Sequence, residues 1–337
     1  MKHVLNLHSL PDSVWDVLIG EALKHAENRA YRSNQHPGKH MGLVFFNDSL
    51  RTRVSMELAA AALGATPVTV TPGSGTWGFA WEKGRPMLGG EAEHIQEAVG
   101  VLSRYVDALG VRLFASGTDR DQDREDALLQ QFAAASAVPV LNLESASRHP
   151  CQALADAAVL TRHFDGHAKG KKFVLSWTNH PKALPMAVPN STLFMAARLG
   201  MDVTVARPDG FELESDVMEK AAELASSSGG RVQESNDLQA AVLGAQVIYA
   251  KSWGAVRRYE HPEAEAKMRQ SHRDWRITES HMHAGDNAQF MHCLPVRRGV
   301  VVDDAVLDGS QTLHLDQAEF RLHGQKALLD WMWEGKG

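Results

Sequence analysis

A polar turn between an apolar segment and an Ala-rich helical segment offers the most direct chemistry in this sequence. Residues 45–53 read Phe-Phe-Asn-Asp-Ser-Leu-Arg-Thr-Arg. The first N–H groups of a helix lack partners within the helix and carry the positive end of its dipole, so an anion can bind there. Ser49 and Thr52 add hydroxyl donors. Arg51 and Arg53 add guanidinium groups that match phosphate oxygens. The pattern predicts a phosphate site, and the alternative is a solvated arginine pair at the start of a helix.

Three further polar clusters follow predicted strands. Residues 144–152 read Glu-Ser-Ala-Ser-Arg-His-Pro-Cys-Gln, residues 177–182 read Trp-Thr-Asn-His-Pro-Lys, and residues 292–298 read His-Cys-Leu-Pro-Val-Arg-Arg. In open α/β sheets, ligands bind beyond the carboxyl ends of the strands. We therefore expect these clusters and the turn at residues 45–53 to converge on one crevice.

The elements that must position these clusters alternate between strands and helices, which indicates parallel sheets flanked by helices. The turn at 45–53 leads into a helix that ends near Gly64. The predicted strands are 42–46, 67–71, 108–114, 138–143, 172–177, 202–206, 246–250 and 289–292. The other predicted helices are 91–105, 152–163, 191–199, 214–226 and 317–333.

Composition narrows the class of protein. A chain of 337 residues exceeds the size that one hydrophobic core usually serves, so two domains are expected. The net charge of −6 argues against a general nucleic-acid surface. We find no apolar run long enough for a membrane span and no secretion signal near the N-terminus, so we expect a cytoplasmic protein. In such a reducing compartment, Cys151 and Cys293 are expected to remain thiols.

Three short motifs, in this order along the chain, resemble those of the aspartate/ornithine carbamoyltransferase superfamily. They are Ser49-Leu50-Arg51-Thr52-Arg53, His149-Pro150-Cys151-Gln152 and His292-Cys293-Leu294-Pro295. Within the superfamily, residues 177–182 and 290–298 resemble the branch that acts on N-acetylornithine or N-succinylornithine. An enzyme for free ornithine would be expected to carry a Ser-Met-Gly loop, and this sequence has none.

The resemblance implies two α/β domains, each with a mostly parallel sheet flanked by helices. Residues 1–150 would bind carbamoyl phosphate and residues 151–316 the acylornithine, with the C-terminal helix 317–337 returning to the first domain. The implied reaction, in arginine biosynthesis, moves a carbamoyl group from carbamoyl phosphate to the δ-amine of an acylated ornithine. It needs no metal and no organic cofactor.

The resemblance also assigns residues to carbamoyl phosphate. Arg112 would bridge the phosphate and the carbonyl oxygen, His149 would donate to that oxygen, and Gln152 would hold the carbamoyl nitrogen. With Thr52 and Cys293, Arg112 and His149 form the catalytic set. The full set for carbamoyl phosphate is Ser49, Leu50, Arg51, Thr52, Trp77, Arg112, His149, Gln152, Cys293, Leu294 and Arg321. The departing phosphate could accept the proton of the amine, so no dedicated base is required.

On the amine side, the sulfur of Cys293 and the carbonyl of Leu294 would orient the nucleophile. The residues that the resemblance assigns to the acylornithine are Ala92, Glu144, His180, Lys251 and Leu294. Trp77 and Ala92 would be contributed to the site of an adjacent subunit in a homotrimer.

The acyl group is the finest distinction that the resemblance addresses. At position 92 acetyl-specific enzymes have glutamate and succinyl enzymes have proline, whereas this chain has Ala92. A glutamate would repel the terminal carboxylate of a succinyl group, and alanine removes that charge. Residues 299–302 also lack the lysine that acetyl-specific relatives carry in this segment. We therefore favour N-succinylornithine, with N-acetylornithine as the alternative.

Other interpretations remain open at this stage. An ordinary ornithine carbamoyltransferase and a non-catalytic paralogue are the other functions considered. Arg112 could instead pair with Asp107, and Arg321 with Glu319 or a neighbouring chain. His281, His283 and His292 do not form a matched set of metal ligands in the sequence.

Overall fold

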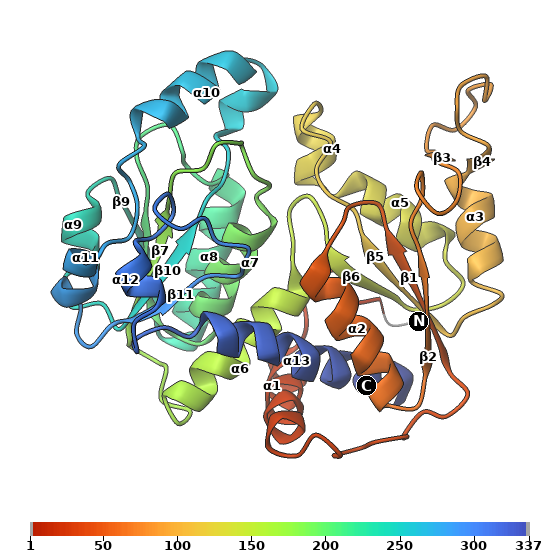
Figure 1. The fold of residues 1–337 in the computed structure, drawn as a ribbon, viewed down its shortest axis with the longest axis horizontal. Coiled ribbons are helices and arrows are strands. Elements are labelled where there is room, and N and C mark those ends of the chain that lie inside the picture. The colour runs from red at the N-terminus through yellow and green to blue at the C-terminus, as the bar shows by residue number, and fades with distance from the viewer. Residues whose placement is uncertain (1–2, 335–337) are drawn as a thin grey trace. The chain divides into compact units, whose positions relative to one another are not determined.

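Short apolar segments alternate with helices along the chain, and the computed structural model shows that they form two separate parallel sheets (Figure 1). The structure describes residues 3–334. Unit 1 comprises Met1–Ser116, Asp121–Leu154 and Arg321–Gly337, and unit 2 comprises Gly117–Arg120 and Ala155–Phe320. The first domain and C-terminal helix expected from the sequence also include residues 1–2 and 335–337, which lie outside the described residues.

The sheet of unit 1 has the strand order β2-β1-β5-β6, and every pairing in it is parallel. Its strands are β1 (His40–Phe45), β2 (Thr66–Val70), β5 (Ala108–Arg112) and β6 (Val140–Glu144). All of β5 is buried, as expected for a central strand covered on both faces. The helices of this region are α1 (Asp12–Glu27), α2 (Leu50–Ala62), α3 (Ile95–Leu102), α4 (Arg120–Arg124) and α5 (Ala127–Ala135).

A small parallel pair of strands lies outside this sheet. It consists of β3 (Phe79–Ala80) and β4 (Glu93–His94), which are joined by a long exposed loop. The loop extends from unit 1 beyond the end of α3 (Figure 1).

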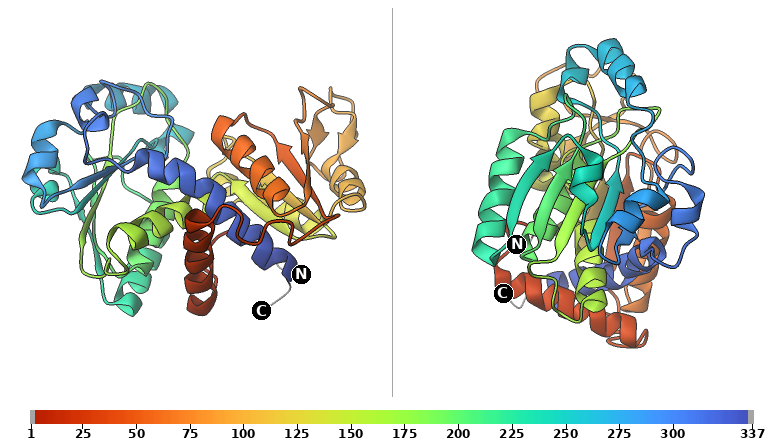
Figure 2. Two further views of the ribbon diagram at one scale, coloured as in Figure 1. Left: turned by 60° about the horizontal axis from the view of Figure 1, so that its bottom comes forward. Right: turned by 90° about the vertical axis from the view of Figure 1, so that its left-hand side faces the viewer.

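The sheet of unit 2 has the order β11-β10-β7-β8-β9 and is also parallel. Its strands are β7 (Lys172–Trp177), β8 (Asp202–Ala206), β9 (Arg231–Ser235), β10 (Val247–Lys251) and β11 (Gln289–Met291). Helices cover both faces of this sheet (Figure 2). They include α7 (Ala187–Arg198), α8 (Ser215–Ser228), α9 (Leu238–Val242), α10 (Pro262–Ser271), α11 (Glu279–Ala284) and α12 (Asp304–Leu307), with a 3₁₀ turn at Val256–Tyr259.

Two helices carry the chain between the units. The chain leaves unit 1 within α6 (Pro150–His163) and returns within α13 (His314–Glu334). The expected domain boundaries were at residues 150 and 316, which are the first residue of α6 and the third of α13. The boundaries between the two units therefore lie after Leu154 and after Phe320, a few residues later in each helix than expected.

The two-domain α/β fold with parallel sheets is confirmed. Strands 172–177 and 202–206 lie where the sequence predicted them. Strand β9 was not predicted, because its polar sequence Arg-Val-Gln-Glu-Ser has no apolar run and most of it is exposed at the sheet edge. The helix predicted over 91–105 is shorter, because Glu93–His94 pairs as a strand and His94 caps α3.

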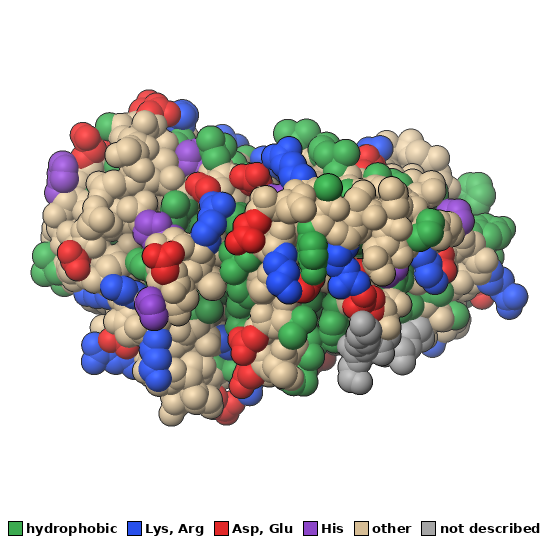
Figure 3. Space-filling model, turned by 90° about the horizontal axis from the view of Figure 1, so that it is seen from below, with side chains coloured by type: hydrophobic (Ala, Val, Ile, Leu, Met, Phe, Trp, Pro, Cys, Tyr) green, Lys and Arg blue, Asp and Glu red, His purple; other side chains and the backbone are tan. Residues whose placement is uncertain are grey.

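The surface fits the modest net charge of the chain. On the face shown in Figure 3, basic and acidic side chains are interspersed over most of the surface. Among the helices of residues 3–334, none combines the length and the apolar character that a membrane span requires.

Candidate active site

The predicted phosphate site lies at the capped start of helix α2 in unit 1. Ser49 is the N-cap of α2, and its Oγ accepts a hydrogen bond from the backbone N–H of Thr52 at 3.1 Å. A serine hydroxyl that accepts in this way can still donate its own hydrogen to a ligand. Leu50 and Arg51 lie in the first turn of α2, which is the positive end of the helix dipole. The geometry therefore supports anion binding at this turn.

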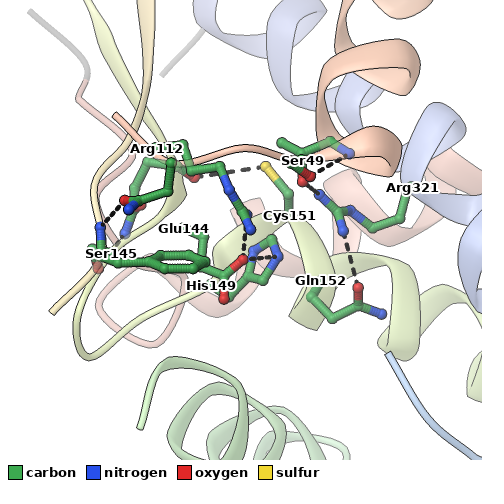
Figure 4. Close-up of polar contacts among 12 residues, drawn as sticks. Ser49, Arg112, Glu144, Ser145, His149, Cys151, Gln152 and Arg321 are labelled. Atoms are coloured by element: carbon green, nitrogen blue, oxygen red, sulfur yellow. Dashed lines mark hydrogen bonds and ion pairs between the residues drawn. The ribbon is translucent and has the colours of Figure 1, made fainter. Parts of the chain in front are cut away.

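Arg321 joins the helix start to a second motif. It is 3% exposed and donates from Nη2 to Thr52 Oγ1 at 2.9 Å. Its Nη1 donates to Gln152 Oε1 at 3.0 Å, in the first turn of α6 (Figure 4). Segments that are far apart in the sequence thus meet around one buried guanidinium. A buried positive charge beside the start of α2 adds to the attraction for an anion.

Arg112, Glu144 and His149 form a second polar group in unit 1. Arg112 ends β5 and Glu144 ends the neighbouring strand β6, so the sheet places the two side chains side by side. Arg112 Nη1 donates to Glu144 Oε2, and His149 Nε2 lies 3.3 Å from the same oxygen (Figure 4). Arg112 also packs over the ring of Phe114, with its Cζ 4.4 Å from the ring centroid.

The alternative pairing of Arg112 with Asp107 is not found in the described part of the structure. Arg112 pairs with Glu144, whereas Asp107 pairs with Lys39 at 2.8 Å. In this structure the carboxylate of Glu144 contacts Arg112 and His149. The assignment of Glu144 to the acylornithine stays a prediction. Arg53 was expected to bind phosphate oxygens. In the structure its Nε lies 3.1 Å from Glu57 Oε1, and its side chain is exposed on α2.

The loop before His149 is anchored by Asp126, which was not predicted as part of the site. Asp126 caps α5 with φ 52°, and its buried carboxylate accepts from Ser145 Oγ at 2.9 Å, Ser147 Oγ at 2.6 Å and Ser147 N at 3.0 Å. Asn142 Nδ2 donates to Ser145 Oγ at 3.0 Å. Burial raises the pKa of Asp126. The alternating serines of the loop were visible in the sequence, but their acceptor is in a different element.

Asp126→Ala is expected to destabilise unit 1 by about 3 kcal/mol, because three buried donors lose their acceptor. Urea unfolding would measure the change. Asp121→Ala, on exposed α4, is the matched control and should change the free energy of unfolding by less than about 0.5 kcal/mol. An unchanged unfolding midpoint for Asp126→Ala would show that this network does not stabilise the loop.

In unit 2, the segment after β11 has an unusual backbone. Leu294 has φ 53°, a left-handed conformation that costs a leucine about 1 kcal/mol. Its N–H donates to His292 Nδ1 at 2.9 Å. Cys293 between them is partly exposed, and Cys151 and Cys293, both in the described part of the chain, do not form a disulfide. Non-glycine residues held in this conformation are common at functional sites.

A group of basic side chains lies in unit 2 beyond β7 and β10. His180 Nε2 accepts from Arg297 Nε at 3.0 Å, and His180 Nδ1 lies 3.0 Å from the backbone N and 2.9 Å from the carbonyl oxygen of Lys182. Burial, followed by the charges of Arg297, Lys251 and Arg269, lowers the pKa of His180. Lys251, at the end of β10, is 9% exposed.

This group suits a carboxylate, because cationic side chains surround a neutral imidazole. Arg297 was not among the assigned residues, although it stands in the quoted segment 292–298.

Trp77 and Ala92 flank the small strand pair of unit 1, just before β3 and β4 respectively. Trp77 is 54% exposed, and its Nε1 donates to Glu93 Oε2 at 2.9 Å. Ala92 is exposed just before β4. The loop between β3 and β4 borders an open hollow of about 600 Å³ whose lining includes Trp81, Arg85 and Leu88. The contribution of Trp77 and Ala92 to an adjacent subunit stays a prediction.

One group of possible metal ligands exists among residues 3–334. Ligand atoms of Glu21, His25 and Asp330 lie within 4.8 Å of one another. Arg32 Nε and His36 Nε2 each lie 2.7 Å from a different oxygen of Asp330, so both oxygens already have partners. We therefore describe this group as an ion-pair cluster. It includes none of the histidines considered from the sequence, which are His281, His283 and His292.

Comparisons with known proteins agree with this geometry. Residues 2–162 match the family model described as aspartate/ornithine carbamoyltransferase, carbamoyl-P binding domain, and residues 186–332 match the Asp/Orn binding domain of the same family. The N-acetylornithine carbamoyltransferase of Xanthomonas campestris pv. campestris is 43% identical over 331 residues, which cover 98% of this chain and 97% of that protein. The N-succinylornithine carbamoyltransferase of Bacteroides thetaiotaomicron is 33% identical over 317 residues, or 94% of each chain.

A solved structure has the same fold over nearly the whole chain. It is a glutamate-to-alanine mutant of N-acetyl-L-ornithine transcarbamylase, complexed with carbamyl phosphate and N-succinyl-L-norvaline. Its TM-score is 0.95 and its identity 43%, over 98% of this chain and 100% of the other. Both family models and the full-length relatives lead to the same conclusion. This chain belongs to the aspartate/ornithine carbamoyltransferase family, in its N-acylornithine branch.

Proposed function

We propose that this carbamoyltransferase transfers the carbamoyl group of carbamoyl phosphate to the δ-amine of N-acetyl-L-ornithine, giving N-acetylcitrulline and phosphate, in arginine biosynthesis. The observation that carries the assignment to carbamoyl transfer is the contact of Arg321 with both Thr52 and Gln152, which brings two of the expected motifs together. The acetyl group is supported by the higher identity to the acetyl enzyme, 43% against 33% for the succinyl enzyme.

Unit 1 would hold carbamoyl phosphate. The phosphate would bind at the start of α2, with Ser49, Arg51 and Thr52 as donors and Arg321 close by. Arg112 and His149 would donate to the carbonyl oxygen, and Gln152 would hold the carbamoyl nitrogen. Donors held in place before the reaction stabilise developing charge without reorganisation during it.

Unit 2 would hold the acylornithine. Lys251 and the neighbouring Arg297 supply positive charge for its carboxylate, while Cys293 and the carbonyl of Leu294 orient the amine. The δ-nitrogen forms a bond to the carbamoyl carbon, and the bond from that carbon to the phosphate oxygen breaks. The phosphate leaves with the electron pair and accepts the proton that the amine loses, so the chemistry balances without a further base.

N-succinylornithine is the second candidate, and Ala92 is the observation that favours it. Position 92 is where the sequence analysis expects glutamate in acetyl-specific enzymes. The solved relative in which a glutamate was replaced by alanine is described as a complex with N-succinyl-L-norvaline. An alanine at this position is therefore compatible with a longer, charged acyl group. Because overall identity favours acetyl and this position favours succinyl, both substrates belong in the same test.

A homotrimer with shared sites is part of the proposal. The loop that would reach an adjacent subunit exposes apolar side chains that a monomer would leave in water: Leu88 is 90% exposed, Trp77 54% and Met87 40%. Several large apolar side chains within residues 77–92 favour contact with another protein surface. A second copy of this chain is the occupant that we propose.

The test is a rate assay at fixed carbamoyl phosphate with N-acetylornithine, N-succinylornithine and ornithine, scored by citrulline-type product and phosphate. We expect N-acetylornithine to have the highest kcat/KM and free ornithine to be at least about 100-fold lower, since about 2.7 kcal/mol of lost binding energy gives that factor. Comparable turnover of ornithine would overturn the acylornithine assignment. A higher kcat/KM for N-succinylornithine would select the second candidate.

A further inference from the structure

We propose that Asp156 and Gln317 are positioning residues for the turn at residues 292–295. The role of this turn in orienting the amine rests on the proposed function, whereas the hydrogen bonds that hold it do not. Neither residue was assigned a role from the sequence, and neither belongs to the three motifs.

Asp156 is a buried acceptor with a donor on each oxygen. It lies on α6 and is 0% exposed. Its Oδ1 accepts from Gln317 Nε2 at 2.7 Å, and its Oδ2 accepts from the hydroxyl of Tyr249 at 3.0 Å. Burial and the nearby charge of Asp156 raise the pKa of Tyr249 well above its usual value, so the phenol keeps its hydrogen and can donate. A carboxylate satisfied on both sides is fixed in its rotamer.

Gln317 connects the Asp156 carboxylate to the backbone of His292. It is 1% exposed, and its Oε1 accepts from the backbone N–H of His292 at 2.8 Å. Only one orientation of its amide satisfies both neighbours, because the carboxylate must face the NH₂ group and the backbone N–H must face the oxygen. The reversed amide would place two acceptors together and two donors together. Asp156 therefore determines which way Gln317 points.

The backbone of His292 is the anchor of the turn. His292 is 2% exposed, and its Nδ1 accepts from the N–H of Leu294 at 2.9 Å. Hydrogen bonds thus hold the backbone on both sides of Cys293. Leu294 does not favour its φ of 53° by itself, so the surrounding contacts must maintain it. The network fixes the positions of the two groups that are expected to orient the amine.

Gln317→Met is the central variant, because it keeps the side-chain length and removes both hydrogen bonds. We expect the KM for N-acetylornithine to rise about 10-fold, the factor that corresponds to 1.4 kcal/mol, while the KM for carbamoyl phosphate stays within about twofold. Asp156→Ala should have a similar effect. Asp156→Asn should rescue, because its Oδ1 can still accept from Gln317 and its amide can donate to the oxygen of Tyr249.

Thiol labelling gives a readout that does not depend on turnover. The chain has two cysteines. Burial raises the pKa of the Cys151 thiol to about 11, and this residue is 0% exposed, so a thiol reagent at pH 8 should report on Cys293. In Gln317→Met and Asp156→Ala, loss of the anchor should increase the labelling rate at least about fivefold. The rate in Asp156→Asn should match wild type, and Cys293→Ser should remove the signal.

The outcomes separate this inference from the proposed function. If the wild-type protein turns over no acylornithine, the proposed function fails, yet labelling still tests the network. Wild-type labelling in Gln317→Met would overturn the inference. So would a KM that rises equally for both substrates together with a lower melting temperature, because that pattern indicates a general loss of structure. A selective rise in the KM for the amine, with faster labelling and an unchanged melting temperature, would support it.

Discussion

Arg112→Ala is expected to lower kcat/KM for N-acetylornithine by about 10³-fold, the largest effect that we predict for one substitution. The guanidinium is 8% exposed at the end of β5, shares an oxygen of Glu144 with His149, and is assigned to the charge that develops on the carbonyl and phosphate oxygens. Its removal takes away a preorganised donor and leaves Glu144 without its cationic partner. Steady-state kinetics with both substrates varied would measure the loss.

Two variants make this test specific. Arg112→Lys keeps the charge but loses the planar fork, so we expect an intermediate loss of about 100-fold. Arg53→Ala is the matched control, because Arg53 belongs to the phosphate motif but is itself exposed and pairs with Glu57. The kcat/KM of this variant should stay within about threefold of wild type. Arg112→Ala activity within that same range, in a protein with an unchanged melting temperature, would remove Arg112 from the catalytic set.

Ala92→Glu is expected to lower the ratio of succinyl to acetyl turnover by about 10-fold or more. A carboxylate at position 92 would repel the terminal carboxylate of a succinyl group, and a repulsion of 1.4 kcal/mol is enough for a tenfold change. N-acetylornithine has no charge at that end, so its turnover should change by less than about threefold. Parallel kcat/KM measurements with the two acylated substrates provide the ratio.

Ala92→Gln separates charge from size in this experiment. Glutamine has nearly the shape of glutamate without its charge, so it should leave the substrate ratio much closer to wild type. Equal losses in the glutamine and glutamate variants would assign the effect to crowding. An unchanged ratio in Ala92→Glu would mean that position 92 does not lie near the acyl group, and the proposed sharing of this loop between subunits would lose its support.

The residue at position 92 and the overall sequence identity favour different acyl groups. Ala92 led the sequence analysis to favour N-succinylornithine, whereas the relatives of higher identity act on N-acetylornithine by name. Ala92 is one side chain on an exposed loop, and its effect depends on which surface that loop contacts. The overall identity averages over nearly the whole chain. The rate assay with both acylated substrates decides between N-acetylornithine and N-succinylornithine.

The sequence by itself determined the parallel α/β fold, the positions of most buried strands and a helix that begins at the polar turn of residues 45–53. These features depend on local signals: apolar runs, a polar turn before an Ala-rich segment, and short motifs in a fixed order. Local signals also explain the failures. The edge strand β9 has no apolar run, and the pair of β3 and β4 is too short to show a pattern.

Only the tertiary structure decided which side chains meet. Glu144 contacts Arg112 because β5 and β6 are neighbours in the sheet, and Arg321 reaches Thr52 because α13 returns to unit 1. The acceptors at Asp126 and Asp156 were likewise invisible, since each receives donors from elements distant in sequence. Residue type limits what a side chain can bind, but strand order, helix packing and rotamer choose its partner, and none of these is encoded in local periodicity.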